Sequence, residues 1–224
     1  MQTILIDIDD TIFDFKKSAS AAIQKAAAEY NLEITPEMLE KYFEINVVLW
    51  QDYENGKIPK SYIFENRFNM LFKDFNINII GTDFEDKFQK YFKTEYEFVD
   101  GAKDFLKYLS SKYDIYAASN STYESQIHRL KSAGVLDYFK DVFISDIAGA
   151  QKPTKEFFDY CFKNIPNVKK EETILIGDSL SSDIQGANNA GIKCCWFNES
   201  GKHCAEVQKY DYEIDKLSKI KDIL

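Results

Sequence analysis

Residues 3–11 read TILIDIDDT, an apolar run that ends among three aspartates, and this stretch indicates the fold. A nearly unbroken apolar run is typical of a parallel strand that is covered on both faces. Side chains two positions apart point to the same side of a strand, so Asp7 and Asp9 project together from its carboxyl end. Asp10 points to the other side, and we interpret it as a turn residue. Open α/β sheets bind their ligands beyond this end of their strands.

Four further apolar runs have the same strand-like character, at residues 114–118, 142–145, 173–177 and 192–197. The segments between the strand-like runs carry helical periodicity, at residues 102–112, 124–134, 155–165 and 182–191. Strands that alternate with helices in this way predict an α/β fold, a Rossmann-like doubly wound parallel sheet.

One long stretch between the first and second strands breaks this alternation. Its periodicity predicts four helices, at residues 18–30, 36–53, 60–75 and 83–98. We therefore expect residues 1–14 and 99–224 to form the catalytic α/β core, and residues 15–98 to form an inserted helical cap domain that sets substrate specificity. Because the insert follows Asp7 and Asp9 directly, such a cap would cover them.

The 224 residues suit one α/β core with a smaller insert. The formal net charge of −9 disfavours binding to a nucleic-acid polymer, because an acidic surface repels backbone phosphates. No apolar run has membrane-spanning length, and the first residues turn acidic where a targeting signal would be basic. We therefore expect a cytoplasmic protein without a membrane partner, as a monomer or a weak homodimer.

Cysteines cluster near the end of the chain and raise the question of a second metal. Cys161 lies in a predicted amphipathic helix, and Cys194 and Cys195 lie in an apolar, strand-like run. We interpret all three as buried, reduced thiols. A zinc site built from Cys194, Cys195, His203 and Cys204 is the alternative, although the spacing is not that of a known structural zinc site.

Two carboxylates at one strand end, those of Asp7 and Asp9, repel each other unless a cation lies between them. A divalent metal with oxygen ligands meets that need, and Mg²⁺ is the usual partner of phosphate groups. A proline at position 153 favours extended backbone at the preceding lysine, which helps that side chain to reach inward. The predicted winding brings polar residues from three later segments to the same edge: Ser119, Asn120, Lys152, Asp178 and Asp183. Carboxylates, a hydroxyl and an ammonium group together favour phosphoryl transfer.

The segments DIDDT, SN, QKP and GDSLSSD resemble, in this order, the four motifs of the haloacid dehalogenase-like hydrolase superfamily. The resemblance covers the whole core, and the helical block resembles the C1-type cap of that superfamily. It implies that Asp7 is the nucleophile that forms an aspartyl-phosphate. It implies that Asp9 is the general acid and then the general base, with its backbone carbonyl on the metal. True haloacid dehalogenases lack an acid at the position of Asp9, so its presence favours a phosphate ester as substrate.

The same resemblance gives roles to the other motif residues. Ser119 and Asn120 are expected to bind the phosphate, and Lys152 to offset negative charge on the phosphate and the nucleophile. Asp183 would support the metal or orient Lys152. Mg²⁺ is the implied cofactor, and its predicted ligands are Asp7, Asp9, Asp178 and Asp183. Taken singly, Ser119 and Asp183 are also typical helix-capping residues, and Lys152 is also typical of a solvated surface.

Within the cap, the segments INVVLWQDYENGKIP and ENRFNMLF resemble the cap of bacterial pyrimidine 5′-nucleotidases. This narrower resemblance implies that Asn46 and Arg67 contact the substrate. A salt bridge between Arg67 and one of the cap glutamates is the alternative. Three aromatic side chains are candidates either for stacking on a base or for core packing: Phe13, Trp50 and Tyr53.

The expected function is a magnesium-dependent phosphomonoesterase that acts through an aspartyl-phosphate, in particular a 5′-nucleotidase for pyrimidine nucleoside monophosphates. Its partner would then be a small phosphorylated metabolite. The alternatives are a phosphatase of sugar phosphates or phosphoglycolate, and a phosphomutase of the same fold. An alternative from another class is a non-catalytic binding or regulatory protein.

Overall fold

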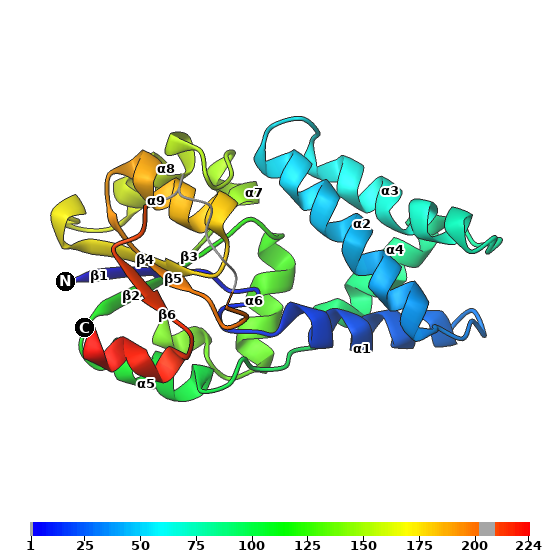
Figure 1. The fold of residues 1–224 in the computed structure, drawn as a ribbon, viewed down its shortest axis with the longest axis horizontal. Helices are drawn as coiled ribbons and strands as arrows, with labels where there is room; N and C mark the ends of the chain where they lie inside the picture. The colour runs from blue at the N-terminus through cyan, green and yellow to red at the C-terminus, as the bar shows by residue number, and fades with distance from the viewer. Residues whose placement is uncertain (1, 202–208) are drawn as a thin grey trace. The chain divides into compact units, whose positions relative to one another are not determined.

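The computed structural model describes residues 2–201 and 209–224. Contacts between residues divide the chain into two compact units (Figure 1). Met1–Asp14 together with Glu97–Leu224 form the first, which we call the α/β unit, and Phe15–Tyr96 form the second, the helical unit. The chain therefore leaves the α/β unit once, soon after its first strand, and returns to it once.

The α/β unit is built on a parallel sheet whose strands lie in the order β3-β2-β1-β4-β5-β6. The strands are β1 (Thr3–Ile6), β2 (Asp114–Ser119), β3 (Asp141–Ile144), β4 (Thr173–Gly177), β5 (Lys193–Phe197) and β6 (Tyr212–Ile214). The first five match the apolar runs of the sequence, and the predicted doubly wound α/β fold is confirmed. The sequence does not predict β6, because three residues with a single buried side chain carry too little periodicity.

The strand order reverses at β1. The chain runs from β1 to β2 and β3 on one side, and then crosses to β4, β5 and β6 on the other. Ligands of open α/β sheets bind at such a switch point, beyond the carboxyl ends of the strands. The carboxyl ends of β1, β2 and β4 are neighbours here, and three of the four predicted motifs follow these strands. The fourth motif, with Lys152, follows β3, the strand beyond β2.

Helices cover both faces of the sheet (Figure 1). α5 (Ala102–Ser110) and the 3₁₀ turns of Leu217–Asp222 pack together on one face, and α8 (Lys155–Asn164) packs with α9 (Gln185–Ala190) on the other. Leu5 and its neighbours in the sheet join the rings of α8 in one apolar core. The other helical segments of this unit are α6 (Tyr123–Ser132), α7 (Ser145–Ala148), the 3₁₀ turns Leu136–Tyr138 and Lys170–Glu172, and a π-helical turn at Leu180–Ile184.

The helical unit consists of α1 (Phe15–Ala28), α2 (Pro36–Glu54), α3 (Lys60–Asp74) and α4 (Gly81–Phe92). The prediction that the fourth helix runs to residue 98 is wrong, because α4 ends at Phe92. After it, the carbonyl of Glu97 accepts a hydrogen bond from the N–H of Asp14 at 2.8 Å. Phe98 then forms an antiparallel bridge with Phe13. Pairing with the segment after β1 therefore overrides the helical periodicity of the sequence.

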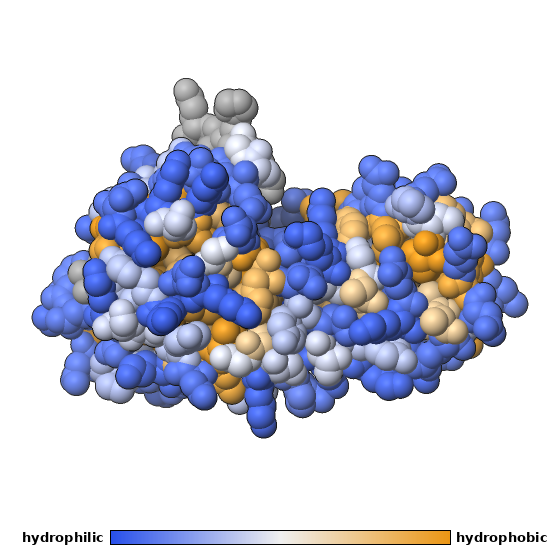
Figure 2. All heavy atoms as spheres, turned by 90° about the horizontal axis from the view of Figure 1, so that it is seen from below, coloured by the Kyte–Doolittle hydropathy of each residue, from blue (hydrophilic) through white to orange (hydrophobic). Residues whose placement is uncertain are grey.

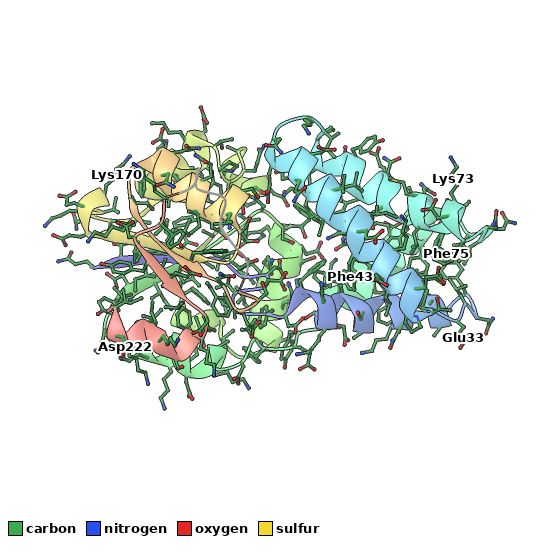
Figure 3. All side chains as sticks on the ribbon, viewed as in Figure 1. Glu33, Phe43, Lys73, Phe75, Lys170 and Asp222 are labelled. Carbon is green, nitrogen blue, oxygen red and sulfur yellow. The ribbon has the colours of Figure 1, made fainter. Side chains whose placement is uncertain are left out.

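Aromatic rings fill the core of the helical unit. The ring of Phe68 lies between those of Tyr42 and Phe84, with centroid distances of 5.1 and 4.7 Å. Phe43 of α2, labelled in Figure 3, packs edge-on against Phe15 of α1 at 6.2 Å. The four helices thus share a core of their own.

Hydrophilic side chains cover most of the surface that Figure 2 shows. The exposed apolar residues are scattered over several elements, which is ordinary for a folded protein. Within the described ranges, no helix combines the length and the apolar character that a membrane span requires.

Candidate active site

A tight turn after β1 presents Asp7 and Asp9. The N–H of Asp7 donates to the carbonyl of Ile176 at 2.9 Å, which extends the pairing of β1 with β4 by one residue. The carbonyl of Ile8 then accepts two N–H groups from within the turn, and Asp10 adopts a φ of 57°. Aspartate tolerates this left-handed backbone better than most residues, which agrees with the turn role expected for Asp10.

Lys152 joins segments that are far apart in the sequence. Its Nζ lies 2.6 Å from Oδ1 of Asp7, 2.6 Å from Oδ1 of Asp183 and 2.7 Å from the carbonyl of Ala118. An ammonium group has three N–H donors, so these acceptors use all of them. Although burial lowers the pKa of Lys152, the charges of Asp183 and Asp7 raise it above the ordinary value. Lys152 is therefore a buried, charged centre rather than a surface lysine.

The carboxylates around Lys152 form a group that suits a divalent cation. Asp7, Asp178 and Asp183 each present a carboxylate oxygen, and these atoms all lie within 4.8 Å of one another. Burial raises the pKa of Asp7, and the charge of Lys152 opposes that rise. A cation would add positive charge where carboxylates outnumber the ammonium group, and a donor set made only of oxygens is the one that Mg²⁺ prefers. The residues therefore fit the metal expected from the sequence.

Neighbouring groups hold Asp183 through its carboxylate and Asp178 through its backbone carbonyl. The N–H of Ser179 donates to Oδ2 of Asp183 at 3.1 Å, and the indole N–H of Trp196 donates to the carbonyl of Asp178 at 2.9 Å. Gly177 leaves room for Asp183, because a Cβ on this glycine would overlap the carboxylate. A buried strand, a glycine and a π-helical turn together place both acids at the end of β4.

Asn120 lies beside the site, but its side chain binds the lysine segment. Its Oδ1 accepts from the N–H of Lys152 at 2.8 Å, and its Nδ2 donates to the carbonyl of Lys152 at 2.9 Å. Both ends of the amide are thus used to fix the backbone from which Lys152 projects. This placement supports a positioning role and gives no support to a contact between this amide and the substrate.

Ser119 ends β2 within this same group of motifs. Its Oγ accepts a hydrogen bond from the N–H of Ser121 at 3.1 Å and lies 3.2 Å from Nε2 of Gln126. The hydroxyl hydrogen remains available to donate, since both contacts use the oxygen as an acceptor. Donation to a phosphate oxygen is therefore compatible with the contacts of Ser119.

The carboxylate of Asp9 is not one of the three whose oxygens lie within 4.8 Å of one another. Its Oδ1 lies 2.6 Å from Nη1 of Arg129, and its Oδ2 lies 2.6 Å from Nε2 of Gln126. The predicted metal contact of Asp9 runs through its backbone carbonyl and stays a prediction. Arg129 and Gln126 lie outside the four motifs. Gln126 and Arg129 lie three positions apart, on the face of α6 that also buries Leu130. Buried polar side chains need hydrogen-bond partners, so polar residues on this face are the signal in the sequence that points to such a role.

The two cap residues predicted to contact substrate are engaged inside the helical unit. Arg67 binds Glu85 through two bonds, Nε to Oε2 at 2.7 Å and Nη2 to Oε1 at 2.6 Å. Its Nη1 donates to Oδ1 of Asn46 at 3.0 Å. Although burial opposes the charge on Arg67, the carboxylate of Glu85 raises its pKa. This arrangement favours the alternative of a buried salt bridge, and the substrate-binding roles of Asn46 and Arg67 stay predictions without support from these contacts.

The aromatic candidates also make core contacts. Phe13 is fully buried, with its ring under the guanidinium of Arg129 at 4.9 Å. The rings of Trp50 and Tyr53 pack edge-on at 5.7 Å, and Tyr53 is buried. Core packing therefore accounts for Phe13 and Tyr53 without a bound base.

The thiols of Cys161, Cys194 and Cys195 are buried and unbridged. Burial raises the pKa of Cys195 to about 12 and that of Cys194 to about 11. His203 and Cys204, the other members of the alternative zinc site, lie outside the described residues.

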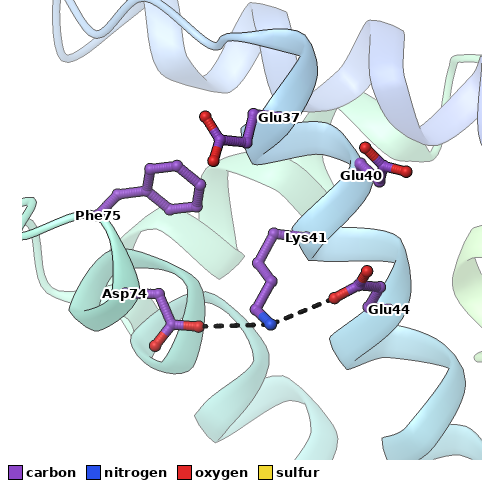
Figure 4. A pocket seen from close by; sticks show the side chains of 6 residues that line it. All are labelled: Glu37, Glu40, Lys41, Glu44, Asp74 and Phe75. Carbon is purple, nitrogen blue, oxygen red and sulfur yellow. Dashed lines mark hydrogen bonds and ion pairs between the residues drawn. The ribbon is translucent and has the colours of Figure 1, made fainter.

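A hollow of about 330 Å³ lies in the helical unit, between the start of α2 and the end of α3 (Figure 4). Lys41 in its middle pairs with Glu44 at 3.2 Å and reaches to 3.8 Å from Asp74. Four carboxylates and this one lysine line the hollow, so it repels a phosphate ester. It is therefore not a second candidate for the substrate site.

Comparison with known proteins assigns the site to a family. A family model described as haloacid dehalogenase-like hydrolase matches residues 4–197. The chain belongs to the haloacid dehalogenase-like hydrolase family. As predicted from the order of its motifs, it is an enzyme of this hydrolase family. The match runs from β1 to β5 and so includes every motif residue described above.

Relatives of this hydrolase extend the comparison over the full chain. It is 35% identical to the HAD-hydrolase YfnB of Bacillus subtilis over 223 residues, which cover 100% of this chain and 95% of YfnB. A crystal structure of YfnB bound to magnesium matches it with a TM-score of 0.95, covering 100% of this chain and 98% of that one.

Two further relatives of this haloacid dehalogenase-like hydrolase are named pyrimidine 5′-nucleotidases. PynA of Streptococcus pneumoniae is 36% identical over 196 residues, which cover 87% of this chain and 83% of PynA. YjjG of Escherichia coli is 27% identical over 221 residues, which cover 99% and 96%. The cap segments indicate a resemblance to this nucleotidase group. The sequence identity to these two relatives confirms that resemblance.

Proposed function

We propose that this hydrolase is a magnesium-dependent phosphomonoesterase that forms a phosphoryl intermediate on Asp7. The observation that carries the proposal is the position of Lys152, whose buried ammonium group binds Asp7 and Asp183 at 2.6 Å each. A carboxylate that is held beside an ammonium group can accept a phosphoryl group whose negative charge is offset where it develops.

In the first step, an oxygen of Asp7 attacks phosphorus, and the bond from phosphorus to the ester oxygen breaks. Asp9 donates its proton to that departing oxygen, which leaves as an alcohol. Ser119 donates to a phosphoryl oxygen during the transfer, and the charge of Lys152 beside Asp7 offsets the negative charge of the phosphoryl group. Support for these roles comes from the geometry: Asp7, Ser119 and Lys152 meet at neighbouring strand ends, and Asp9 follows Asp7 by two residues.

In the second step, Asp9 accepts a proton from a water molecule whose oxygen attacks phosphorus. The bond between phosphorus and Asp7 then breaks, which releases inorganic phosphate and restores both carboxyl groups. The two steps balance without any co-reactant except water.

Asp7, Asp178 and Asp183 are the residues that would hold Mg²⁺. When bound, the metal supplies positive charge to the phosphoryl oxygens. The crystal structure of the relative YfnB with magnesium supports the choice of this cation.

We further propose that the physiological substrates are pyrimidine nucleoside monophosphates. The support is the relationship to PynA and YjjG, which are named for this activity. We also propose that the helical unit acts as the cap that selects the substrate. Its support is its insertion directly after the turn that presents Asp7 and Asp9.

A phosphatase screen with Mg²⁺ tests this function. Nucleoside monophosphates, sugar phosphates and phosphoglycolate are compared at equal concentration, with Asp7→Asn as the inactive control. We expect release of inorganic phosphate that is fastest with UMP and dTMP and absent in the variant. A preference for sugar phosphates or phosphoglycolate would contradict the nucleotide assignment alone. Activity in Asp7→Asn would contradict the nucleophile assignment.

A further inference from the structure

We propose that Arg129 and Gln126 are positioning residues that hold the carboxyl group of Asp9 in place for proton transfer. The inference rests on the proposed role of Asp9 as general acid and base. It concerns two residues of α6 that the four sequence motifs do not include.

The contacts bind each oxygen of Asp9 separately. Nη1 of Arg129 lies 2.6 Å from Oδ1, and Nε2 of Gln126 lies 2.6 Å from Oδ2. A carboxyl group held at one oxygen can still rotate about its last bond, whereas one held at both oxygens has a fixed plane. Each oxygen has a second lone pair, so the two contacts leave sites on which a proton can reside.

The two positioning residues are themselves fixed. Arg129 is fully buried, and its guanidinium lies 4.9 Å above the centre of the Phe13 ring. Its Nη1 also lies 3.2 Å from Oε1 of Gln126. Gln126 is fully buried as well, and its Nε2 lies 3.2 Å from Oγ of Ser119. Through Gln126, the acid is therefore tied to the hydroxyl proposed to bind the phosphate.

Exposure differs between the two sides of the ion pair. The side chain of Arg129 is 0% exposed, whereas that of Asp9 is 25% exposed. Here the cation is enclosed and the acid remains accessible. This arrangement suits a buried arginine that positions an accessible, reacting carboxyl group.

The chemistry makes the proposal testable without knowledge of the physiological substrate. A general acid matters most when the departing oxygen is strongly basic, and least when it leaves readily as an anion. Phenyl phosphate and p-nitrophenyl phosphate have similar shapes, but phenolate is much the more basic leaving group. Loss of positioning at Asp9 should therefore slow cleavage of phenyl phosphate more than cleavage of p-nitrophenyl phosphate.

The experiment measures kcat/KM for both esters, because this constant covers the step that breaks the ester bond. The variants are Gln126→Met, Arg129→Met and Arg129→Lys. Gln126→Met removes the hydrogen bonds that Gln126 forms with Asp9, Ser119 and Arg129 without leaving a buried charge unpaired. The control is His128→Ala, on the same helix but exposed. For Gln126→Met and Arg129→Met we expect a loss of about 100-fold on phenyl phosphate and less than about tenfold on p-nitrophenyl phosphate. Arg129→Lys should restore part of the loss, and His128→Ala should match the wild type.

Equal losses on the two esters in Gln126→Met would overturn the proposal, since a general weakening of the fold does not distinguish leaving groups. An effect of His128→Ala as large as that of Gln126→Met would overturn it too. A wild-type enzyme that releases phosphate from neither ester and not from UMP would instead refute the proposed function. The results that refute the positioning role therefore differ from the result that refutes the proposed function.

Discussion

The carboxylate of Asp183 lies against Gly177, in space that a methyl group on that glycine would fill. The same carboxylate binds Lys152 through Oδ1 and the N–H of Ser179 through Oδ2. Any atom added at Gly177 must therefore displace an acid that two other groups hold. The close approach of strand β4 to Asp183 is thus a requirement of the proposed metal site.

Gly177→Ala tests this requirement. Its methyl group should push Asp183 from its place and weaken Mg²⁺ binding by about 10- to 100-fold, the usual effect of disturbing the supports of a metal site. Titration calorimetry with Mg²⁺ measures the change. Gly81→Ala is the matched control, because its Cβ would overlap Asn69 in the helical unit. It should lower stability but leave Mg²⁺ affinity unchanged, and equal Mg²⁺ affinity in Gly177→Ala and wild type would contradict the account.

Lys152→Met should cost both stability and activity. Removing one partner of a buried ion pair costs about 3–5 kcal/mol, because Asp7 and Asp183 would then face each other without the ammonium group. Turnover should fall by about 100- to 1,000-fold or more, since charge on the phosphoryl group would lose its nearest cation. Urea denaturation and a phosphatase assay measure the two effects.

The control for this variant is Lys155→Met, three residues further along. Lys155 forms an exposed pair with Asp159, and exposed pairs contribute little to stability. We expect wild-type behaviour from it. A Lys152→Met enzyme that is as stable and as active as Lys155→Met would contradict the stabilising and catalytic roles of the buried ion pairs.

The pair of Arg67 and Glu85 should stabilise the helical unit. Arg67→Met leaves a buried carboxylate without its partner and should lower stability by about 3–5 kcal/mol. The double variant Arg67→Met with Glu85→Leu should recover part of that loss, because no unpaired charge remains. Thermal denaturation followed by circular dichroism measures both. A raised KM with unchanged stability in Arg67→Met would instead support the direct substrate contact that the sequence suggests.

The buried cysteines should resist alkylation. The reactive form is the thiolate, and burial raises the pKa of Cys195 to about 12 and that of Cys194 to about 11, so little thiolate exists at pH 8. In a Cys204→Ser background, iodoacetamide should leave Cys161, Cys194 and Cys195 unlabelled in the native protein and label all three after denaturation. Mass spectrometry counts the labels. Rapid labelling of the native protein would contradict the burial of these side chains.

Strand positions follow from the sequence because strands buried on both faces need apolar side chains at nearly every position. The run TILIG coincides with β4, and the run at residues 114–118 falls one residue short of β2. β6 carries no such signal, since only Ile214 of its three residues is buried. The end of α4 is missed for another reason, because pairing between Phe13 and Phe98 takes the chain out of its helical pattern.

The sequence likewise predicts one part of the site and not another. Motif order places Asp7, Lys152 and Asp183 after strands that end at the same edge of the sheet, and the fold brings Lys152 within hydrogen-bonding distance of both acids. The partners of Asp9 could not be read in the same way. They depend on how α6 is rotated about its axis, and no linear spacing relates position 9 to positions 126 and 129.

The partners of side-chain amides and guanidinium groups are the hardest to predict from the sequence. Asn120 stands beside Ser119 in the motif, yet both ends of its amide bind the backbone of Lys152. Arg67 has many possible carboxylate partners in the helical unit, and only the packing of α3 on α4 selects Glu85. Tertiary packing selects these hydrogen-bond and ion-pair partners. The periodicity of the sequence carries no information about that packing.

The most direct test of the account asks where the phosphoryl group goes. Enzyme mixed with substrate and Mg²⁺ is quenched in acid within one turnover, digested and analysed by mass spectrometry. We predict one phosphoryl group on Asp7, removed by hydroxylamine as expected of an acyl phosphate and missing in Asp7→Asn. Phosphate release without any phosphoryl group on Asp7, or with one on another residue, would contradict the assignment of Asp7 as nucleophile.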